Sequence, residues 1–175
     1  MTRRLRYSVA ASVDGFIATK DGGYDWIIAE SAIDFAAYLS TLDTLLMGRG
    51  TWEIARTPEG AGVLEGMKVC VASTTMPADA DPRITVVSDD VPGRVAAMKA
   101  EDGKDIWLFG GGVLFRSMLE AGLVDRVEVA VIPALLGSGT PLLPGLDGLA
   151  TLTLHSSEVF DSGIVLLKYD VSDLG

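Results

Sequence analysis

Two glycine-rich segments have the residue types and spacing of phosphate-binding turns. The first is Gly48–Thr51, which follows an apolar run and precedes a segment with helical character. The first amides of a helix lack partners within it, and the helix dipole is positive there, so such a turn binds anions. Arg49 adds a forked cationic donor that suits a phosphate ester. The alternative is an ordinary strand-to-helix turn with a solvated arginine.

The second segment is Gly110-Gly111-Gly112, again between an apolar run and a helical pattern. Three glycines let a backbone approach a ligand closely, because no Cβ stands in the way. We therefore expect a pyrophosphate at this helix start. The spacing differs from the G-x-G-x-x-G fingerprint of other dinucleotide sites. The alternative is a tight turn with close packing of helix on strand.

Polar and aromatic residues near other predicted strand ends are further candidates. Ser73 and Thr74 follow a strand and can donate hydroxyls to a ribose phosphate, or else cap a turn. Asp14 and Trp26 can shape a flat pocket; alternatively, Asp14 is a turn residue that bonds its own backbone and Trp26 is a core aromatic. His155 has no Cys or His partners at ligand spacing, so no metal site is expected.

The elements that must position these residues alternate between strand and helix. Strands are predicted at Leu5–Ser12, Phe16–Ala18, Thr44–Met47, Lys68–Ala72, Ile84–Val87, Asp105–Phe109 and Val127–Pro133. Helices are predicted at Ser31–Leu42, with Ser31 as N-cap, and after Gly48, Asp90 and Gly112. Thr151–Leu154 and Ile164–Val171 predict an antiparallel closing pair. We expect one α/β domain over residues 1–175: a mixed, mostly parallel central sheet with helices on both faces and ligands at the strands' carboxyl ends.

Composition excludes several classes of partner. The net charge of −10 on 175 residues argues against a nucleic-acid or anionic-membrane surface. No apolar run approaches the roughly 20 residues that span a bilayer. The basic N-terminus is not followed by a signal-peptide core, and the one cysteine, Cys70, lies in an apolar run, so we expect a cytoplasmic protein. The apolar run Val127–Leu136 suggests a sheet edge or face that pairs in a homodimer; the alternative is a core completed within one chain.

In this order the motifs resemble the dihydrofolate reductase-like family. Met47–Glu53 resembles that family's M-G-R-x-T-W-E, Phe109–Gly112 its I-G-G-G, and Ser73-Thr74 its paired hydroxyl residues. Ile132–Leu142 is similar to the C-terminal reductase domain of riboflavin biosynthesis and its stand-alone bacterial relatives. The resemblance covers roughly residues 5–171 and implies the three-layer dihydrofolate reductase-like fold.

The resemblance also implies that the cofactor is NADPH. Three groups of residues would bind it: Gly48, Arg49, Gly50 and Thr51 at the adenosine side and pyrophosphate; Ser73 and Thr74 at the ribose phosphate; and Gly111, Gly112, Val113 and Leu114 at the other side of the pyrophosphate. Ala10 and Ile17 would flank the nicotinamide, with Phe109 beside them.

The sequence departs from dihydrofolate reductases at the pterin site. Ala32 aligns with the carboxylate on their first helix, with Asp34 a short shift away, and Ala130 aligns with an assisting threonine. These changes argue against dihydrofolate as substrate. Ser88 also stands where some members have a lysine for the ribose phosphate.

We therefore expect an NADPH-dependent reductase that transfers a hydride to a C=N or C=O bond of a small heterocycle. Its cleft would be lined by Asp14, Trp26 and Asp34, and either aspartate would supply the proton if burial raised its pKa. Two alternatives stay open: reduction of a ribosylamino-pyrimidine in riboflavin biosynthesis, and a non-catalytic NADPH-binding protein.

Overall fold

The computed structural model describes residues 3–57 and 60–174 of the chain. The strands are β1 (Leu5–Ser12), β2 (Phe16–Ala18), β3 (Leu42–Gly48), β4 (Lys68–Ala72), β5 (Ile84–Val87), β6 (Asp105–Gly110), β7 (Arg126–Ile132), β8 (Thr140–Pro141), β9 (Ala150–Val159) and β10 (Val165–Leu174). The helices are α1 (Phe35–Ser40), α2 (Arg49–Ala55), α3 (Val91–Ala100) and α4 (Gly112–Glu120), with a short 3-10 helix, η1, at Ala61–Leu64. Within the two described ranges no helix has both the length and the apolar character needed to cross a membrane.

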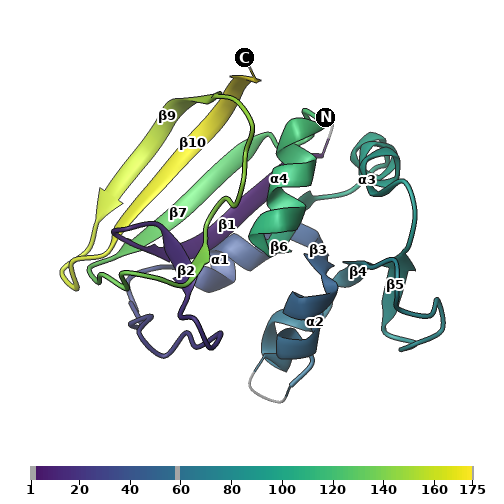
Figure 1. Cartoon of the computed structure of the whole chain (residues 1–175), viewed down its shortest axis with the longest axis horizontal. Helices are drawn as coiled ribbons and strands as arrows, with labels where there is room; N and C mark the ends of the chain where they lie inside the picture. The colour runs from purple at the N-terminus through teal and green to yellow at the C-terminus, as the bar shows by residue number, and fades with distance from the viewer. Residues whose placement is uncertain (1–2, 58–59, 175) are drawn as a thin grey trace.

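Eight of these strands form one sheet in the order β5-β4-β3-β6-β1-β7-β10-β9 (Figure 1). Neighbours from β5 to β7 run parallel, whereas β10 runs antiparallel to both β7 and β9. β2 and β8 form a separate antiparallel pair. The predicted mostly parallel sheet with an antiparallel C-terminal pair is confirmed, and both closing strands are longer than predicted.

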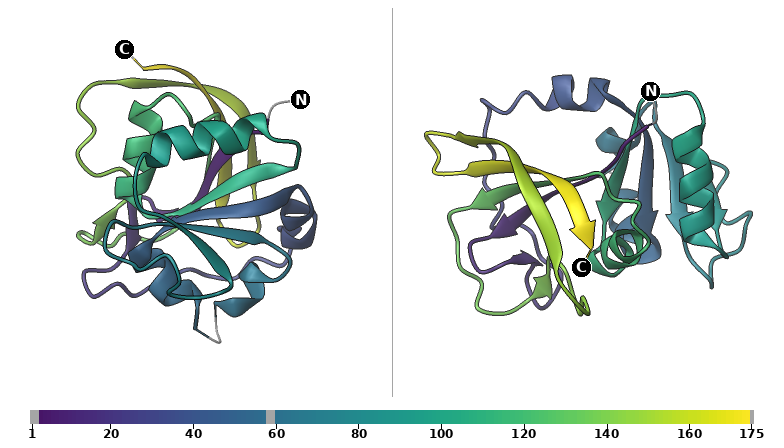
Figure 2. Two further views of the ribbon diagram at one scale, coloured as in Figure 1. Left: turned by 90° about the vertical axis from the view of Figure 1, so that its right-hand side faces the viewer. Right: turned by 90° about the horizontal axis from the view of Figure 1, so that it is seen from above.

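Helices cover both faces of the sheet, as the sequence predicts. On one face, α3 and α4 pack on the strands through Leu5, Tyr7, Val95, Met98, Leu108, Phe115 and Met118. On the other face, α1 and α2 pack through Tyr38, Leu39, Leu45, Met47, Trp52 and Trp107. Figure 2 shows α1 and α4 on opposite sides of the sheet. Because successive strand residues point to opposite faces, Tyr7 lies on the α4 face and Ser8 on the α1 face.

The first helix is shorter than predicted. It begins at Phe35 and its N-cap is Asp34, whose Oδ1 accepts a hydrogen bond from the Ala37 amide at 2.8 Å. Ser31 therefore does not cap it, although serine and aspartate are both favoured cap residues. At the other end Leu42 is buried and already belongs to β3, so the helix has to stop before it.

The sequence predicts that Val127–Leu136 forms a sheet edge or face that pairs in a homodimer, and the edge prediction is wrong. Residues 126–132 form β7, which pairs with β1 on one side and β10 on the other. The apolar residues of this run reflect a strand with two neighbours, which needs no second chain. The outer strands of the sheet are β5 and β9.

Candidate active site

A cavity opens where two neighbouring strands separate. β1 pairs with β6 only from Leu5 to Tyr7, whereas its pairing with β7 continues to Ser12. Beyond Tyr7 the strands diverge, and the Ser8 carbonyl accepts a hydrogen bond from Trp107 Nε1 at 3.0 Å. The cavity at this split has a volume of about 900 Å³. It lies at the carboxyl ends of parallel strands, where ligands bind in open α/β sheets.

Two helices begin at this cavity. Gly48 is the N-cap of α2 and Gly111 is the N-cap of α4, and neither helix start has a hydrogen bond from a capping side chain. Gly48, Gly50, Thr51 and Gly111 line the cavity. The first amides of each helix are therefore left for a ligand or for water.

The glycines of the two turns have different structural roles. Gly110 has a φ of 138°, a conformation that residues with a Cβ rarely adopt. A Cβ on Gly112 would lie 2.6 Å from Pro144 Cδ, so close packing, one of the alternatives, explains this glycine. A Cβ on Gly50 would meet none of the described atoms within 4 Å outside its own helix. Gly50 thus borders space that the described fold does not fill.

Arg49 lies in a polar cluster with hydroxyls at the end of β4. Its Nη1 donates to Thr75 Oγ1 at 2.9 Å, and that oxygen lies 3.5 Å from Ser73 Oγ. Ser73 Oγ also accepts from the Met76 amide at 3.1 Å and so caps the turn. Thr74 is exposed, and the hydroxyl that Arg49 contacts belongs to Thr75, which the sequence analysis missed. The run of three hydroxyl residues, 73–75, was the available signal.

The residues predicted to surround a nicotinamide meet at the same cavity. Ala10, Ile17 and Phe109 all line it, as do Val113 and Leu114 of α4. This placement is the one that a shared nicotinamide site requires, and their contact with a cofactor stays a prediction.

Several further lining residues were missed, among them Ser8, Tyr24, Ile27 and Trp107. Tyr24 and Ile27 lie in the irregular segment after β2 and are 52% and 36% exposed. Such a segment has no helix or strand periodicity, so its direction could not be predicted. Ser8 did leave a signal, because it is a polar residue inside an otherwise apolar part of β1.

Asp14 fixes a loop and does not line the cavity. Its Oδ1 accepts from Ser12 Oγ at 2.6 Å and from the Leu136 amide at 3.1 Å, and its Oδ2 accepts from the Gly137 amide at 2.7 Å. The Ser12 hydrogen bond is the main cause that holds the pKa of this exposed carboxyl below its ordinary value. The condition under which Asp14 was expected to supply a proton, a pKa raised by burial, is therefore not met, because the three donors favour the charged form.

The other two predicted cleft residues are also not among those that line the cavity. Asp34 is exposed and caps α1. Trp26 is partly buried against Ile132 and Ile164, and its Nε1 donates to the Gly23 carbonyl at 3.3 Å. The core alternative describes Trp26 better than the prediction that it shapes the cleft. No structural support remains for either aspartate as the proton donor.

The cavity wall is uncharged. Across residues 3–57 and 60–174, those that line it include no Asp, Glu, Lys, Arg or His. Polar recognition there comes from backbone amides and from hydroxyls such as those of Ser8 and Thr51. In the same two ranges no three His, Cys, Asp or Glu side chains gather where they could hold a metal ion.

Comparison with known proteins agrees with this architecture. Residues 3–166 match the family model described as the RibD C-terminal domain. The chain is 30% identical over 178 residues to the uncharacterized protein YyaP of Bacillus subtilis, covering 95% of this chain and 94% of that protein. It is 28% identical to the riboflavin biosynthesis protein RibD of Mycobacterium tuberculosis and spans 50% of that protein's length.

Solved structures give the same result. A putative riboflavin biosynthesis protein from Shewanella sp. PV-4 superposes with a TM-score of 0.81 at 26% identity, covering 99% of this chain and 100% of that one. A pyrimidine reductase-like protein from Corynebacterium diphtheriae has a TM-score of 0.73 at 16% identity, over 98% and 92% of the two chains, and shows the shared fold alone. Because residues 3–166, most of the chain, match this family model, the chain belongs to the RibD C-terminal domain family.

Proposed function

We propose that this chain is an NADPH-dependent reductase that transfers a hydride to a C=N or C=O bond of a small heterocycle. One observation carries the proposal: the cavity at the split between β1 and β6 meets the uncapped starts of both α2 and α4. Membership of the RibD C-terminal domain family supports a reductase.

The residues at the cavity fit a dinucleotide. Gly50 lines the cavity, and the space that its Cβ would enter is open, so a pyrophosphate can approach the backbone closely there. The amides after Gly48 and Gly111 would bind that pyrophosphate. Ala10, Ile17 and Phe109 would orient the nicotinamide beside Ser8. When bound, the reduced nicotinamide supplies the hydride. The chain orients the nicotinamide and surrounds it with a mostly apolar cavity wall.

The cluster of Arg49, Ser73 and Thr75 supports NADPH over NADH. The Arg49 guanidinium lies 2.9 Å from the Thr75 hydroxyl, which lies 3.5 Å from the Ser73 hydroxyl. Such a group of donors suits the extra ribose phosphate of NADPH. The Arg49 side chain is 56% exposed, and its ion pair with Glu53 is long, at 3.9 Å, so a phosphate can compete for the guanidinium.

Dihydrofolate does not suit the substrate end. Ala130 lies in register with Ala10, so this part of β7 offers a methyl group in place of a hydroxyl. Ala32 is exposed and offers no carboxylate. These positions favour a substrate that is recognised by other groups.

Reduction of a ribosylamino-pyrimidine in riboflavin biosynthesis is the second candidate. The family match and the Shewanella structure favour it. That substrate carries a phosphate, whereas among residues 3–57 and 60–174 no cationic side chain lines the cavity. We therefore place it second.

The test combines binding with turnover. Titration with NADPH should quench tryptophan fluorescence, because Trp107 lines the cavity. Loss of NADPH absorbance is then followed with a panel of pterins, pyrimidines and quinones. Oxidation with one class supports a reductase, whereas stoichiometric binding without oxidation of any would favour the non-catalytic alternative. Absence of NADPH binding would overturn the proposal.

We also propose a homodimer, now through the outer strand β9 in place of β7. Leu152, Leu154 and Val159 of β9 are 39%, 54% and 74% exposed. Light scattering should give twice the chain mass, and charged substitutions at Leu154 and Val159 should reduce it to one chain.

A further inference from the structure

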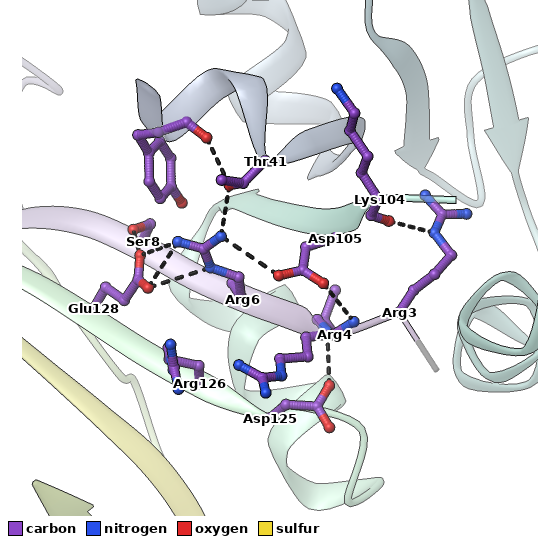
Figure 3. Close-up of polar contacts among 12 residues, drawn as sticks. Arg3, Arg4, Arg6, Ser8, Thr41, Lys104, Asp105, Asp125, Arg126 and Glu128 are labelled. Atoms are coloured by element: carbon purple, nitrogen blue, oxygen red, sulfur yellow. Dashed lines mark hydrogen bonds and ion pairs between the residues drawn. The ribbon is translucent and has the colours of Figure 1, made fainter. Parts of the chain in front are cut away.

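A buried ion pair stands directly behind one cavity residue. Ser8 of β1 and Glu128 of β7 are register partners on the α1 face, and Ser8 Oγ donates to Glu128 Oε2 at 2.6 Å (Figure 3). Glu128 is 2% exposed and Arg6 is 8% exposed. Arg6 donates to Glu128 Oε1 from Nη2 at 2.9 Å and from Nε at 3.2 Å.

The surroundings hold this pair in one arrangement. Arg6 Nη1 also donates to Thr41 Oγ1 at 2.9 Å, and it lies 3.5 Å from Asp105 Oδ2 (Figure 3). The Tyr38 ring lies against the guanidinium, 4.7 Å from ring centroid to Cζ. Burial, and then the charge of Glu128, raise the pKa of Tyr38, so its hydroxyl keeps its proton. Arg6 donates to Glu128 Oε1 and Ser8 donates to Glu128 Oε2, so both carboxyl oxygens act as acceptors.

The direction of the Ser8 hydrogen bond determines what the cavity offers a ligand. A serine hydroxyl has one hydrogen and two lone pairs. The hydrogen is committed to Glu128, and the Ser8 carbonyl is already bound by Trp107 Nε1. Ser8 thus presents an acceptor to the cavity and no donor.

We infer that Ser8, oriented by Glu128, selects ligands that place an N–H or amino donor at this point of the cavity. The inference deepens the proposed function, on which it rests, by naming the substrate class: a neutral ring with a hydrogen-bond donor. Ser8 is the contacting residue, and Glu128 is a positioning residue that acts through it. A ring with only acceptors there would face the lone pairs of Ser8 and leave both partners unpaired, which costs binding free energy.

The proposed roles of Ser8 and Glu128 are tested with two probes of similar shape, 2,4-diaminoquinazoline and 2,4-dimethoxyquinazoline. The amino groups donate, whereas the methoxy groups only accept. Calorimetry measures both dissociation constants on the free chain and on the chain saturated with NADP⁺. We expect wild type to prefer the diamino probe by at least about tenfold, equivalent to about 1.4 kcal/mol.

Two variants separate recognition from structural support. In Ser8→Ala the preference should fall to near one, and Ser8→Thr should restore it. In Glu128→Gln the amide can donate to Ser8 Oγ, which frees the Ser8 hydrogen for the cavity, so the preference should shift toward the dimethoxy probe. A purely structural ion pair predicts no such reversal. Ser117→Ala is the matched control, because Ser117 lines the same cavity from α4; it should keep the wild-type preference.

The outcomes distinguish this inference from the proposed function. An unchanged preference in Ser8→Ala, or binding of neither probe to a wild-type chain that binds NADPH, overturns the inference alone. Failure of NADPH to bind overturns the proposed function, while the probe titrations on the free chain still decide the role of Ser8. Should Glu128→Gln fail to fold, Ser8→Ala and Ser8→Thr carry the decision.

Discussion

Gly50→Ala should weaken cofactor binding without weakening the fold. A Cβ at this position meets none of the described atoms within 4 Å outside its own helix, and the backbone is helical. Alanine is a better helix former than glycine by up to about 1 kcal/mol, so the unliganded variant should be as stable as wild type or slightly more so. The added methyl group enters the space assigned to the pyrophosphate.

The size of the effect follows from mass action. A tenfold loss of affinity corresponds to about 1.4 kcal/mol. At an NADPH concentration of about 100 times the wild-type Kd, the ligand should stabilise wild type by about 2.7 kcal/mol. At that concentration it should stabilise the variant by only about 1.4 kcal/mol, because the variant is then at about ten times its own Kd.

Urea unfolding with and without NADPH measures both quantities. Gly62→Ala is the matched control, because its Cβ also meets no described atom within 4 Å and Gly62 lies in η1, outside the cavity lining. The control should gain the full wild-type stabilisation from NADPH. A Gly50→Ala variant that does the same would refute the placement of the pyrophosphate beside α2.

Three further outcomes are expected. Arg49→Ala should weaken NADPH about tenfold and leave NADH nearly unchanged in parallel fluorescence titrations, because the guanidinium is assigned to the extra phosphate; equal losses would contradict that assignment. Arg6→Leu should lower the free energy of unfolding by about 3–5 kcal/mol, since it leaves Glu128 buried without its cation, and adding Glu128→Leu should recover most of the loss in urea unfolding; an additive double variant would argue against coupling. The pKa of Asp14 is lower in the folded chain than its ordinary value of 3.8, so its stabilising effect is present above that pH and is lost as the pH falls through the folded-state pKa. Wild type should therefore lose more stability than Asp14→Asn as the pH falls below about 3.8, and parallel loss would contradict the loop contacts.

Local sequence patterns predicted the strands and the glycine turns because each has a local cause. Apolar runs of four to eight residues become buried strands, and a glycine at the end of a run allows the helix to begin at once. The start of α1 was missed because Ser31 and Asp34 are both acceptable caps, and the choice depends on the path of the preceding irregular loop.

The lateral neighbours of a strand are not visible in its own sequence. The apolar run Val127–Leu136 suggests a sheet edge or face that binds a partner, although β7 has strands on both sides. For the same reason the sequence of β7 alone does not show what Glu128 contacts. The strand register places Glu128 opposite Ser8, with Arg6 on the same face, and only this arrangement identifies its two partners.

The predicted cofactor residues were largely brought together, whereas the predicted proton donors were not. The cofactor positions lie at strand-to-helix turns, which parallel topology gathers at one edge of the sheet. Asp14 and Asp34 lie in loops, where the direction of a side chain depends on distant contacts such as the Leu136 and Gly137 amides. Thr75 was missed by one residue for the same reason.

A crystal structure of the chain with bound NADPH is the most direct measurement. It should show the pyrophosphate at the amides that follow Gly48 and Gly111, and the nicotinamide between β1 and β6 beside Ala10. Density for the dinucleotide at another surface would contradict the account. So would a cavity between β1 and β6 that contains only water in crystals grown at saturating NADPH.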